Sequence, residues 1–432
     1  MALGSVGWAA LWFFAIFLLL VVRNALHRNP VDLATLVVGT LPALMYLREL
    51  FFYNSVLVAF GAIVLIWHIA KPEGYRRLWD NLRLRWLLIA SAAYWVITLM
   101  LTGDYSVNLR ILEMSLSAAA IYLLSWHRSS LATAFFGILL SAVSIGLAFL
   151  AFGERLGMGE INGVRIGNPI TLGLPLTLAF VLALADGGKW LGLEKSPLLR
   201  QIAPLAAGGL LLLSTSRASW LIALIALGVL FVLQSERRAM LLRFAVVAVF
   251  GVLILLQSER GEYVTHWFDK TVSDDQTIMQ KSSGRSDQWM LFPEVFLDSP
   301  VWGFGPGSGQ SIYAQYSRTS SFVTFQAGKE FMWHSLVMHL GVETGIIGLT
   351  VLFLIVGGLA VQGFKHHRYC GEVAPLLGAV AYLTIAMTVT AMDANSGAFL
   401  GLGFLSYLKT PENNANTFAG KFSSRTTKVW RG

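Results

Sequence analysis

The sequence predicts an all-α polytopic membrane protein with twelve transmembrane helices, or thirteen if every apolar segment spans, and one large loop outside the cytoplasm. Composition is the first reason: of 432 residues, 56% are hydrophobic and 13% are charged, whereas soluble chains carry about a quarter charged residues. Second, apolar runs long enough to cross a hydrocarbon core of about 30 Å recur along the chain. Third, basic residues gather between alternate runs. Backbone in lipid must satisfy its own hydrogen bonds, so these runs are expected to be helices.

The apolar segments give the expected helices in order. They cover residues 8–22, 31–47, 50–69, 86–101, 109–126, 131–152, 168–185, 202–215, 218–233, 239–256, 335–361, 374–391 and 396–408. The segments 31–47, 202–215 and 396–408 are short for a span, which leaves the number of helices open by one. We expect residues 1–257 to hold the first ten of thirteen helices, 258–333 to form the large loop, 334–408 to hold the C-terminal helices and 409–432 to be a cytoplasmic tail.

The positions of the basic residues predict which loops face the cytoplasm. Clusters of Lys and Arg lie at 71–85, 189–200, 237–243, 365–368 and 421–431. An excess of Lys and Arg is typical of the cytoplasmic loops of membrane proteins. The net charge of +8 is therefore attributed to membrane topology, and nucleic acid is not an expected partner. The loop 258–333, with six basic and nine acidic residues, falls on the outer side.

Cysteine and histidine usage argues against a metal site or a cofactor. The only cysteine is Cys370, so disulfides and cysteine-rich metal sites are not expected. The sequence contains neither a HisGluxxHis motif nor a histidine pair four residues apart. Aspartates 269, 274, 275 and 287 of the large loop could form a cation site, but solvated acidic side chains are the simpler interpretation. We expect neither a metal ion nor a cofactor.

Several arginines stand at helix ends on the expected outer side, where an arginine that cannot reach water is costly. Arg217 lies in SerThrSerArgAlaSerTrp, with no polar loop between the two flanking helices, so the turn must be tight. Arg165 lies in a turn-rich approach to the next helix, with Pro169 near the first turn of that helix. Arg110 belongs to the same outer set. Arg165 and Arg217 can face one shared cavity, or each can be neutralised by a buried carboxylate or a helix C-terminus.

The large loop contains one predicted helix and one glycine-rich segment. The sequence GlyArgSerAspGlnTrpMetLeuPhe predicts an interfacial helix that bears Arg285, with Trp289, Phe292 and Phe296 on one face. Residues 303–309, GlyPheGlyProGlySerGly, allow close backbone approach, and their amides could bind an anion. A structural turn is the simpler role, because the segment lacks the ending of a phosphate-binding P-loop.

His334 begins the return to the membrane, beside the only extended polar loop. A histidine at such a boundary can titrate near neutral pH, which suits a general base. Glu343 lies nine residues further and falls nearly opposite His334 on a helix, so a dyad of the two is disfavoured. We expect Glu343 to cap or pair with another helix.

Four stretches in this order resemble the O-antigen ligase and O-antigen polymerase superfamily, bacterial enzymes that act on glycans linked to undecaprenyl diphosphate. They are ThrSerArgAlaSerTrpLeu at 215–221, GlyArgSerAspGlnTrp at 284–289, SerProValTrpGlyPheGlyProGly at 299–307 and HisSerLeuValMetHisLeuGlyValGluThrGlyIleIleGly at 334–348. Each is short, and their joint order carries the resemblance. The family usually has Asn after the histidine, whereas this chain has Ser335. This difference weakens any role that the family would assign to that neighbour.

The resemblance implies a glycosyltransferase of the bacterial inner membrane with its active site on the periplasmic side. An acceptor hydroxyl, of lipid A–core for a ligase, attacks the anomeric carbon, and the diphosphate leaves. Guanidinium groups suit a diphosphate because they stay charged and donate in pairs. Arg217 and Arg285, with Arg165 and Arg110 in substrate binding, are the expected clamp, and His334 is the expected base. The resemblance therefore implies that the configuration at the anomeric carbon is inverted and that no metal ion takes part. Membrane lipids are expected to surround the polyprenyl tail.

Two alternatives remain open at the level of sequence. A polymerase of the same superfamily, joining repeat units into O-antigen or exopolysaccharide, needs the same clamp and base. We favour a ligase because the single compact outer loop ending at His334 is closer to the ligase arrangement. A flippase or secondary transporter for polyprenyl glycans would instead place ionisable residues near mid-membrane. Aromatic residues of the loop, among them Trp289, Trp302, Tyr313 and Tyr316, can stack on sugars or be buried at the membrane surface.

Overall fold

The computed structural model describes residues 30–45, 76, 80–102, 106–151, 159–161, 164–166, 169–257, 285–321, 323, 326–389 and 393–407. The expected helices 8–22 and 50–69, the first part of the large loop and the tail 409–432 lie outside these residues. Each remaining apolar segment coincides with at least one observed helix.

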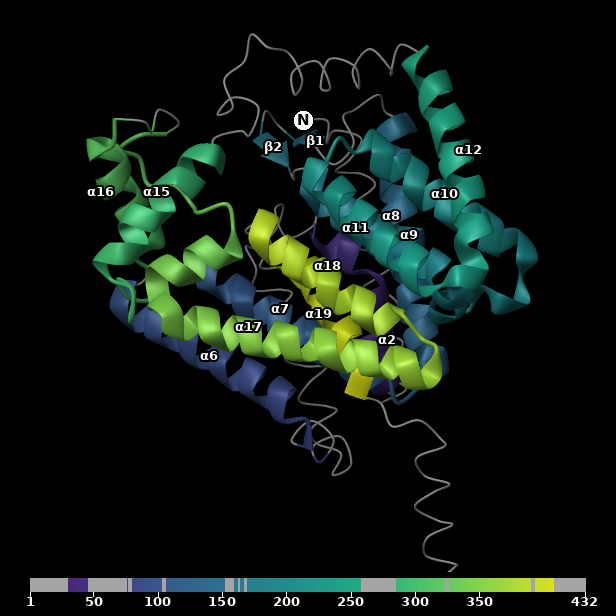
Figure 1. The fold of residues 1–432 in the computed structure, drawn as a ribbon, viewed down its shortest axis with the longest axis horizontal. Coiled ribbons are helices and arrows are strands. Elements are labelled where there is room, and N and C mark those ends of the chain that lie inside the picture. Colours follow the sequence, from purple (N-terminus) through teal and green to yellow (C-terminus); the bar gives the residue numbers. More distant parts are fainter. Residues whose placement is uncertain are drawn as a thin grey trace, which may run out of the picture.

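The elements of the first half are α2 (Pro30–Gly39), α6 (Leu82–Thr102), α7 (Ser106–Leu124), α8 (Arg128–Ala151), β1 (Gly159–Ile161), β2 (Val164–Ile166), α9 (Pro169–Leu184), η1 (Ala185–Leu191) and η2 (Leu193–Lys195). Those of the second half are α10 (Pro197–Leu213), α11 (Arg217–Leu233), η3 (Ser235–Arg237), α12 (Arg238–Leu256), α15 (Arg285–Asp298), α16 (Gly309–Thr319), α17 (Leu336–Cys370), α18 (Ala374–Thr388), α19 (Ala394–Phe404) and η4 (Leu405–Tyr407). Figure 1 shows their arrangement.

The described chain is helical, as expected, apart from one short hairpin. Strands β1 and β2 pair antiparallel, with Glu160 opposite Arg165. The two residues between them are Asn162 and Gly163, a pair that favours two-residue hairpin turns. The local sequence therefore favours strands here, in a chain that was expected to be all helical. Helix α9 then begins at Pro169, the position predicted for the first turn.

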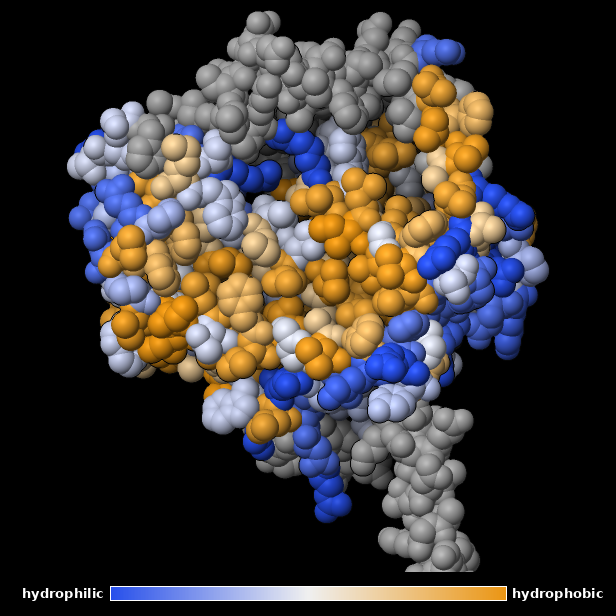
Figure 2. All heavy atoms as spheres, viewed as in Figure 1, coloured by the Kyte–Doolittle hydropathy of each residue, from blue (hydrophilic) through white to orange (hydrophobic). Residues whose placement is uncertain are grey.

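Helix length and surface character support a multi-pass membrane protein. Within the described ranges, four helices are long and apolar enough to cross a membrane: Leu82–Leu101, Arg128–Ala151, Pro169–Leu191 and Leu336–Cys370. A fifth span results if Arg217–Leu233 and Ser235–Arg243, which meet at a bend of 110°, are counted together. Figure 2 shows apolar side chains spread over α17, α18 and α11, with hydrophilic ones gathered at the left and right edges. An apolar surface of this size requires a non-aqueous neighbour.

The short helix α19 lies at the centre of the bundle, between α7 and α18. All of its 11 residues are buried. A Cβ added to Gly397 would come within 2.3 Å of the carbonyl oxygen of Met114, and one added to Gly401 within 2.8 Å of Ile121. Small residues of this kind let two helices approach closely in a membrane. Asp393 caps the helix by accepting a hydrogen bond of 2.8 Å from the Ser396 amide.

Helices α15 and α16 lie apart from the bundle, over the N-terminal end of α17 (Figure 1). They share a small apolar core with α17 and the segment before it. Its buried members include Leu291, Val295, Tyr313, Trp333, Met338 and Val342. The predicted helix bearing Arg285 is confirmed as α15, but the prediction for its apolar face is only partly right. Leu291 and Val295 are buried, whereas Trp289 is 42% exposed, because α17 and α16 contact a face rotated from the predicted one.

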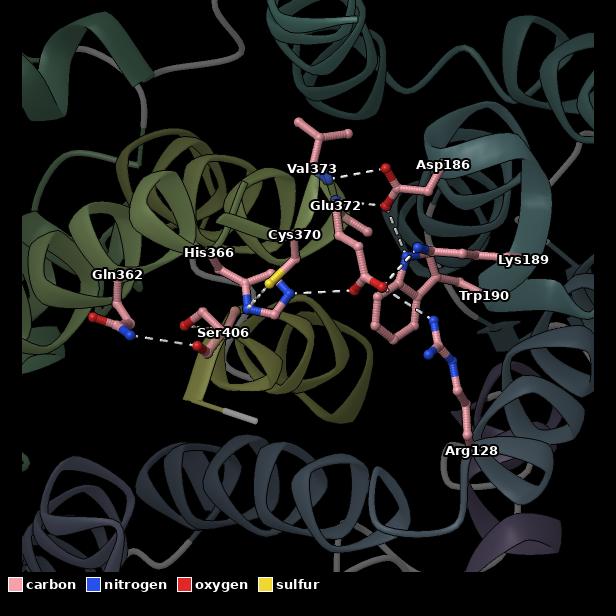
Figure 3. A network of polar contacts seen from close by, with 12 residues as sticks. Arg128, Asp186, Lys189, Trp190, Gln362, His366, Cys370, Glu372, Val373 and Ser406 are labelled. Atoms are coloured by element: carbon pink, nitrogen blue, oxygen red, sulfur yellow. Dashed lines mark hydrogen bonds and ion pairs between the residues drawn. The ribbon is translucent and has the colours of Figure 1, made fainter. Parts of the chain in front are cut away.

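A polar network joins the loops at one end of the bundle (Figure 3). Glu372, between α17 and α18, accepts from Lys189 Nζ at 2.6 Å and Arg128 at 3.1 Å, and lies 3.2 Å from His366 Nε2. Burial alone would raise the pKa of the Glu372 carboxyl, but the hydrogen bonds from His366 and Lys189, together with the charges of Lys189 and Arg128, lower this pKa to about 2. The carboxylate therefore joins α8, η1 and α17.

Asp186 makes a second set of contacts at this end, in a left-handed conformation with φ 50°. Its carboxylate accepts from the amides of Val373 and Ala374 at 2.9 and 3.1 Å, and so caps the N-terminus of α18. It also accepts from Trp190 Nε1 at 2.8 Å and from Gln234 Nε2 at 2.7 Å. The turn after α9, the start of α18 and the α11–α12 junction are thus held together by one side chain.

The network predicts unequal effects of removing charges from it. Glu372→Gln should lower the free energy of unfolding at pH 7 by about 2–3 kcal/mol, because the depressed pKa stabilises the fold above the ordinary carboxyl pKa. This contribution is lost as the pH falls from 4.5 toward 2. Arg128→Gln should change the free energy of unfolding by less than about 1 kcal/mol, because the Arg128 side chain is 66% exposed. Thermal unfolding in detergent measures both, and equal losses would contradict this account.

Candidate functional site

Arg217 is the first residue of α11 and follows a tight polar turn, as predicted. Helix α10 ends at Leu213, so Ser214, Thr215 and Ser216 alone join the two helices, and all three are buried. Thr215 adopts φ 53°, a left-handed conformation that is uncommon for a β-branched residue. The turn places the half-buried Arg217 at the start of α11.

Two contacts hold this turn in place. The indole of Trp220 donates to the carbonyl oxygen of Leu211 at 2.8 Å, which ties α11 back to α10. The hydroxyls of Ser216 and Ser219 lie 2.8 Å apart, and a Cβ added to Gly173 of α9 would come within 2.4 Å of the Ser219 oxygen. Since α9 fits against the turn this closely, the position of Arg217 is determined by three helices.

Arg285 begins α15 and lies close enough to Arg217 for the two charges to repel. Burial lowers the pKa of the Arg285 guanidinium, and the charge of Arg217 lowers it further. Its Nε atom is buried and has no hydrogen-bond partner among the described residues. A buried donor without an acceptor, next to a like charge, is costly. An anion that accepts from both arginines would remove both costs.

Gln288 connects Arg285 to the segment before α17. It lies one turn after Arg285, is fully buried, and accepts from the amide of His334 at 2.7 Å. Its own amide nitrogen donates to the carbonyl oxygen of Met332 at 2.9 Å. No role for Gln288 is predicted from the sequence, although it stands in the same short motif as Arg285. Its position one turn from a site residue was the available signal.

His334 stands just before α17 and is held on both sides. Its ring meets Phe331 edge to face, with centroids 5.0 Å apart. The next residue, Ser335, caps α17: its hydroxyl accepts from the Met338 amide at 3.4 Å and donates to the carbonyl oxygen of Ala386 at 3.0 Å. Burial lowers the pKa of His334 from 6.5 to about 4, and the charge of Arg285 contributes. The imidazole is therefore neutral at pH 7 and can accept a proton. The expectation that it titrates near neutral pH is wrong, because burial and the charge of Arg285 disfavour the protonated ring.

The glycine-rich segment forms a turn against α17, as predicted, and its amides already hold an anionic side chain. Gly307 and Gly309 donate to the two carboxylate oxygens of Glu343 at 2.6 and 3.0 Å. Glu343 also accepts from the hydroxyl of Tyr94 on α6, so the expectation that it pairs with another helix is confirmed. Tyr313, one of the aromatic residues expected either to stack on sugars or to be buried, is fully buried against Trp333, with ring centroids 5.5 Å apart.

The structure thus brings Arg217, Arg285 and His334 into one electrostatically coupled group. Arg110 lies half-buried in α7, three residues before the buried Glu113, and Arg165 lies in β2. The roles of these two arginines stay predictions. Among the residues that the structure describes, no group of three or more His, Cys, Asp or Glu side chains is placed to hold a metal ion.

Comparison with known proteins gives one family. Residues 202–353 match the family model described as O-antigen ligase. The match begins in α10, contains α11, α15 and α16, and ends within α17, so it includes Arg217, Arg285 and His334. No curated protein matches the chain.

The coupling of Arg285 to His334 predicts a measurable shift. Arg285→Gln should raise the pKa of His334 from about 4 toward 6.5, because it removes a positive charge beside the ring. Histidine NMR titration of protein in micelles measures this, with the exposed Arg318→Gln as control. The unfolded chain binds more protons than the native state between pH 4 and 6.5, so His334 makes wild-type stability rise with pH across this window. An unchanged His334 pKa in the Arg285 variant would contradict the arrangement.

Proposed function

Because the chain belongs to the O-antigen ligase and O-antigen polymerase superfamily, we propose that it transfers a glycan from undecaprenyl diphosphate to a sugar hydroxyl of lipid A–core. The observation that carries this proposal is the coupled group of Arg217, Arg285 and His334. An anion between two guanidinium groups that repel each other would be stabilised by both, and a neutral imidazole beside them can accept a proton. A diphosphate leaving group and an acceptor hydroxyl suit these two properties.

The proposed reaction is a single displacement. The acceptor oxygen attacks the anomeric carbon from the face opposite the diphosphate, the bond from that carbon to the diphosphate oxygen breaks, and His334 takes the hydroxyl proton. The configuration at the anomeric carbon is therefore inverted. Arg217 and Arg285 stabilise the charge that develops on the departing diphosphate, the task that a divalent cation performs in other transferases. The proposed reaction uses no metal ion.

Binding of the donor would also change the pKa of His334. The charge of Arg285 helps to hold the pKa of His334 near 4 in the substrate-free protein. A diphosphate bound to Arg217 and Arg285 would offset that positive charge and raise the basicity of the imidazole. His334 would then become a stronger base when a donor is present.

The proposal includes a topology. The chain would have twelve or thirteen transmembrane helices in the bacterial inner membrane, with residues 258–333 in the periplasm and the active site on that side. The basic loops, including the network around Glu372, would then face the cytoplasm. Arg165 and Arg110 would contact the donor next to the clamp, and the polyprenyl tail would lie among membrane lipids.

The same arrangement suits a repeat-unit polymerase, and the size of the product separates the two enzymes. Purified protein in detergent would receive polyprenyl-diphosphate glycan with either lipid A–core or a second repeat unit as acceptor. A polymer product would replace the ligase proposal with a polymerase. If neither acceptor is used while the lipid-linked glycan crosses the membrane of a proteoliposome, the protein is a flippase or transporter.

Substitutions in the coupled group test the assigned roles in this assay. His334→Ala should lower kcat by about 10²–10⁴-fold, the range for loss of a general base. Arg217→Ala and Arg285→Ala should each lower kcat/KM by about 10²-fold or more, as loss of charge stabilisation does elsewhere. Arg318→Ala, at an exposed arginine of α16, is the matched control and should retain wild-type transfer. EDTA should have no effect. Full transfer by both His334→Ala and Arg217→Ala would exclude the proposed mechanism.

A further inference from the structure

Glu343 is a buried carboxylate whose oxygens are both occupied. It lies on α17 and is 1% exposed. One oxygen, Oε2, accepts from the Gly307 amide at 2.6 Å and from the Tyr94 hydroxyl. The other, Oε1, accepts from the Gly309 amide at 3.0 Å and lies 3.4 Å from His339 Nε2. Such charge-assisted bonds in a dry environment are strong and directional. This full set of contacts leaves the carboxylate without room for a substrate.

Backbone contacts extend the same attachment over the whole glycine-rich segment. The amides of Phe304 and Gly305 donate to the carbonyl oxygens of Val342 and Glu343 at 2.8 and 3.0 Å. Helix α17 breaks locally at Gly345, with φ 60° and ψ −152°. A Cβ there would come within 2.4 Å of the Val301 carbonyl oxygen. The break therefore serves to bring the segment onto the helix, and only a glycine allows this approach.

The attached segment holds the elements that carry the coupled group. It follows directly after α15, which begins with Arg285, and it leads into α16 at Gly309. The indole of Trp333 donates to the Gly309 carbonyl oxygen at 2.9 Å, and His334 is the next residue. Movement of the segment would thus shift α15 and the residue before His334 together.

We infer that Glu343 is a positioning residue: by holding residues 303–309 on α17, it keeps Arg285 of α15 beside His334. Of the tests below, only the measurement of glycan transfer rests on the proposed function. The carboxylate touches neither arginine of the clamp in the contacts described above, and it acts through the amides of Gly307 and Gly309. Its role is to preorganise the site, because a clamp and a base assist a transfer only when both are held in place.

Three variants test the attachment directly. Glu343→Gln keeps the shape of the side chain but turns a donor toward the amides or the Tyr94 hydroxyl. Tyr94→Phe removes one donor and leaves both amide bonds, so it keeps the inference testable if Glu343→Gln does not fold. Glu294→Gln, at an exposed carboxylate of α15, is the matched control. Hydrogen exchange of peptides covering 303–309 should quicken by about tenfold or more in Glu343→Gln, less in Tyr94→Phe and not at all in the control.

Two further readouts connect the attachment to the site. In Glu343→Gln the pKa of His334 should rise from about 4 toward 6.5, because Arg285 and the buried surroundings move away from the ring. Glycan transfer should fall by about tenfold or more through kcat, with KM changed less, as expected for lost preorganisation. His334→Ala should lower kcat by about 10²–10⁴-fold without quickening exchange, which separates the base from the positioning residue.

The outcomes are distinguishable from failure of the proposed function. If wild-type protein transfers no glycan while exchange and the His334 pKa change as expected in Glu343→Gln, the proposed reaction fails and the positioning role stands. Unchanged exchange at 303–309 in Glu343→Gln would overturn the attachment. Faster exchange with an unchanged His334 pKa and full transfer would overturn the positioning role.

Discussion

The repulsion between two half-buried guanidinium groups is the constraint on which the site depends. Arg217 and Arg285 come from elements far apart in sequence, and the structure holds them close enough for one to lower the pKa of the other. Such an arrangement is unfavourable by itself, so it requires rigid support. The support is the tight turn between α10 and α11 on one side, and the attachment of α15 and its glycine-rich segment to α17 on the other. An anionic ligand would turn the repulsion into affinity.

The position of His334 follows from the same support. Gln288 holds the histidine amide, and Ser335 starts α17 immediately afterwards, so the imidazole is placed by α15 and α17 together. Because burial and Arg285 keep the ring neutral, the proposed base is in the correct protonation state before any substrate arrives. Charge and geometry are thus linked: the residue proposed to bind the leaving group also controls the residue proposed to take the proton.

Much of the fold and of the candidate site was predictable from the sequence, because the length of apolar segments, the residues that favour turns and the positions of charges are properties of local sequence. The structure confirms the tight turn at Arg217, the turn at 303–309 and the pairing of Glu343 with another helix. It also confirms helices at those expected apolar segments that lie among the described residues. The rest depended on packing. The burial of Tyr313, the contacts of Gln288 and the central place of α19 arise from segments distant in sequence, which periodicity does not reveal. The face of α15 was predicted from spacing, yet its contacts with α16 and α17 decided which residues are buried.

The most direct test of the central claim is a titration of His334 with and without the donor's headgroup. Histidine NMR of the protein in micelles would be recorded alone and with saturating undecaprenyl diphosphate, using undecaprenol as the control for the lipid tail. If the diphosphate binds between Arg217 and Arg285, it offsets the charge beside the ring, and the pKa of His334 rises from about 4. An unchanged pKa at saturation with the diphosphate, or an equal rise with undecaprenol, would contradict the account.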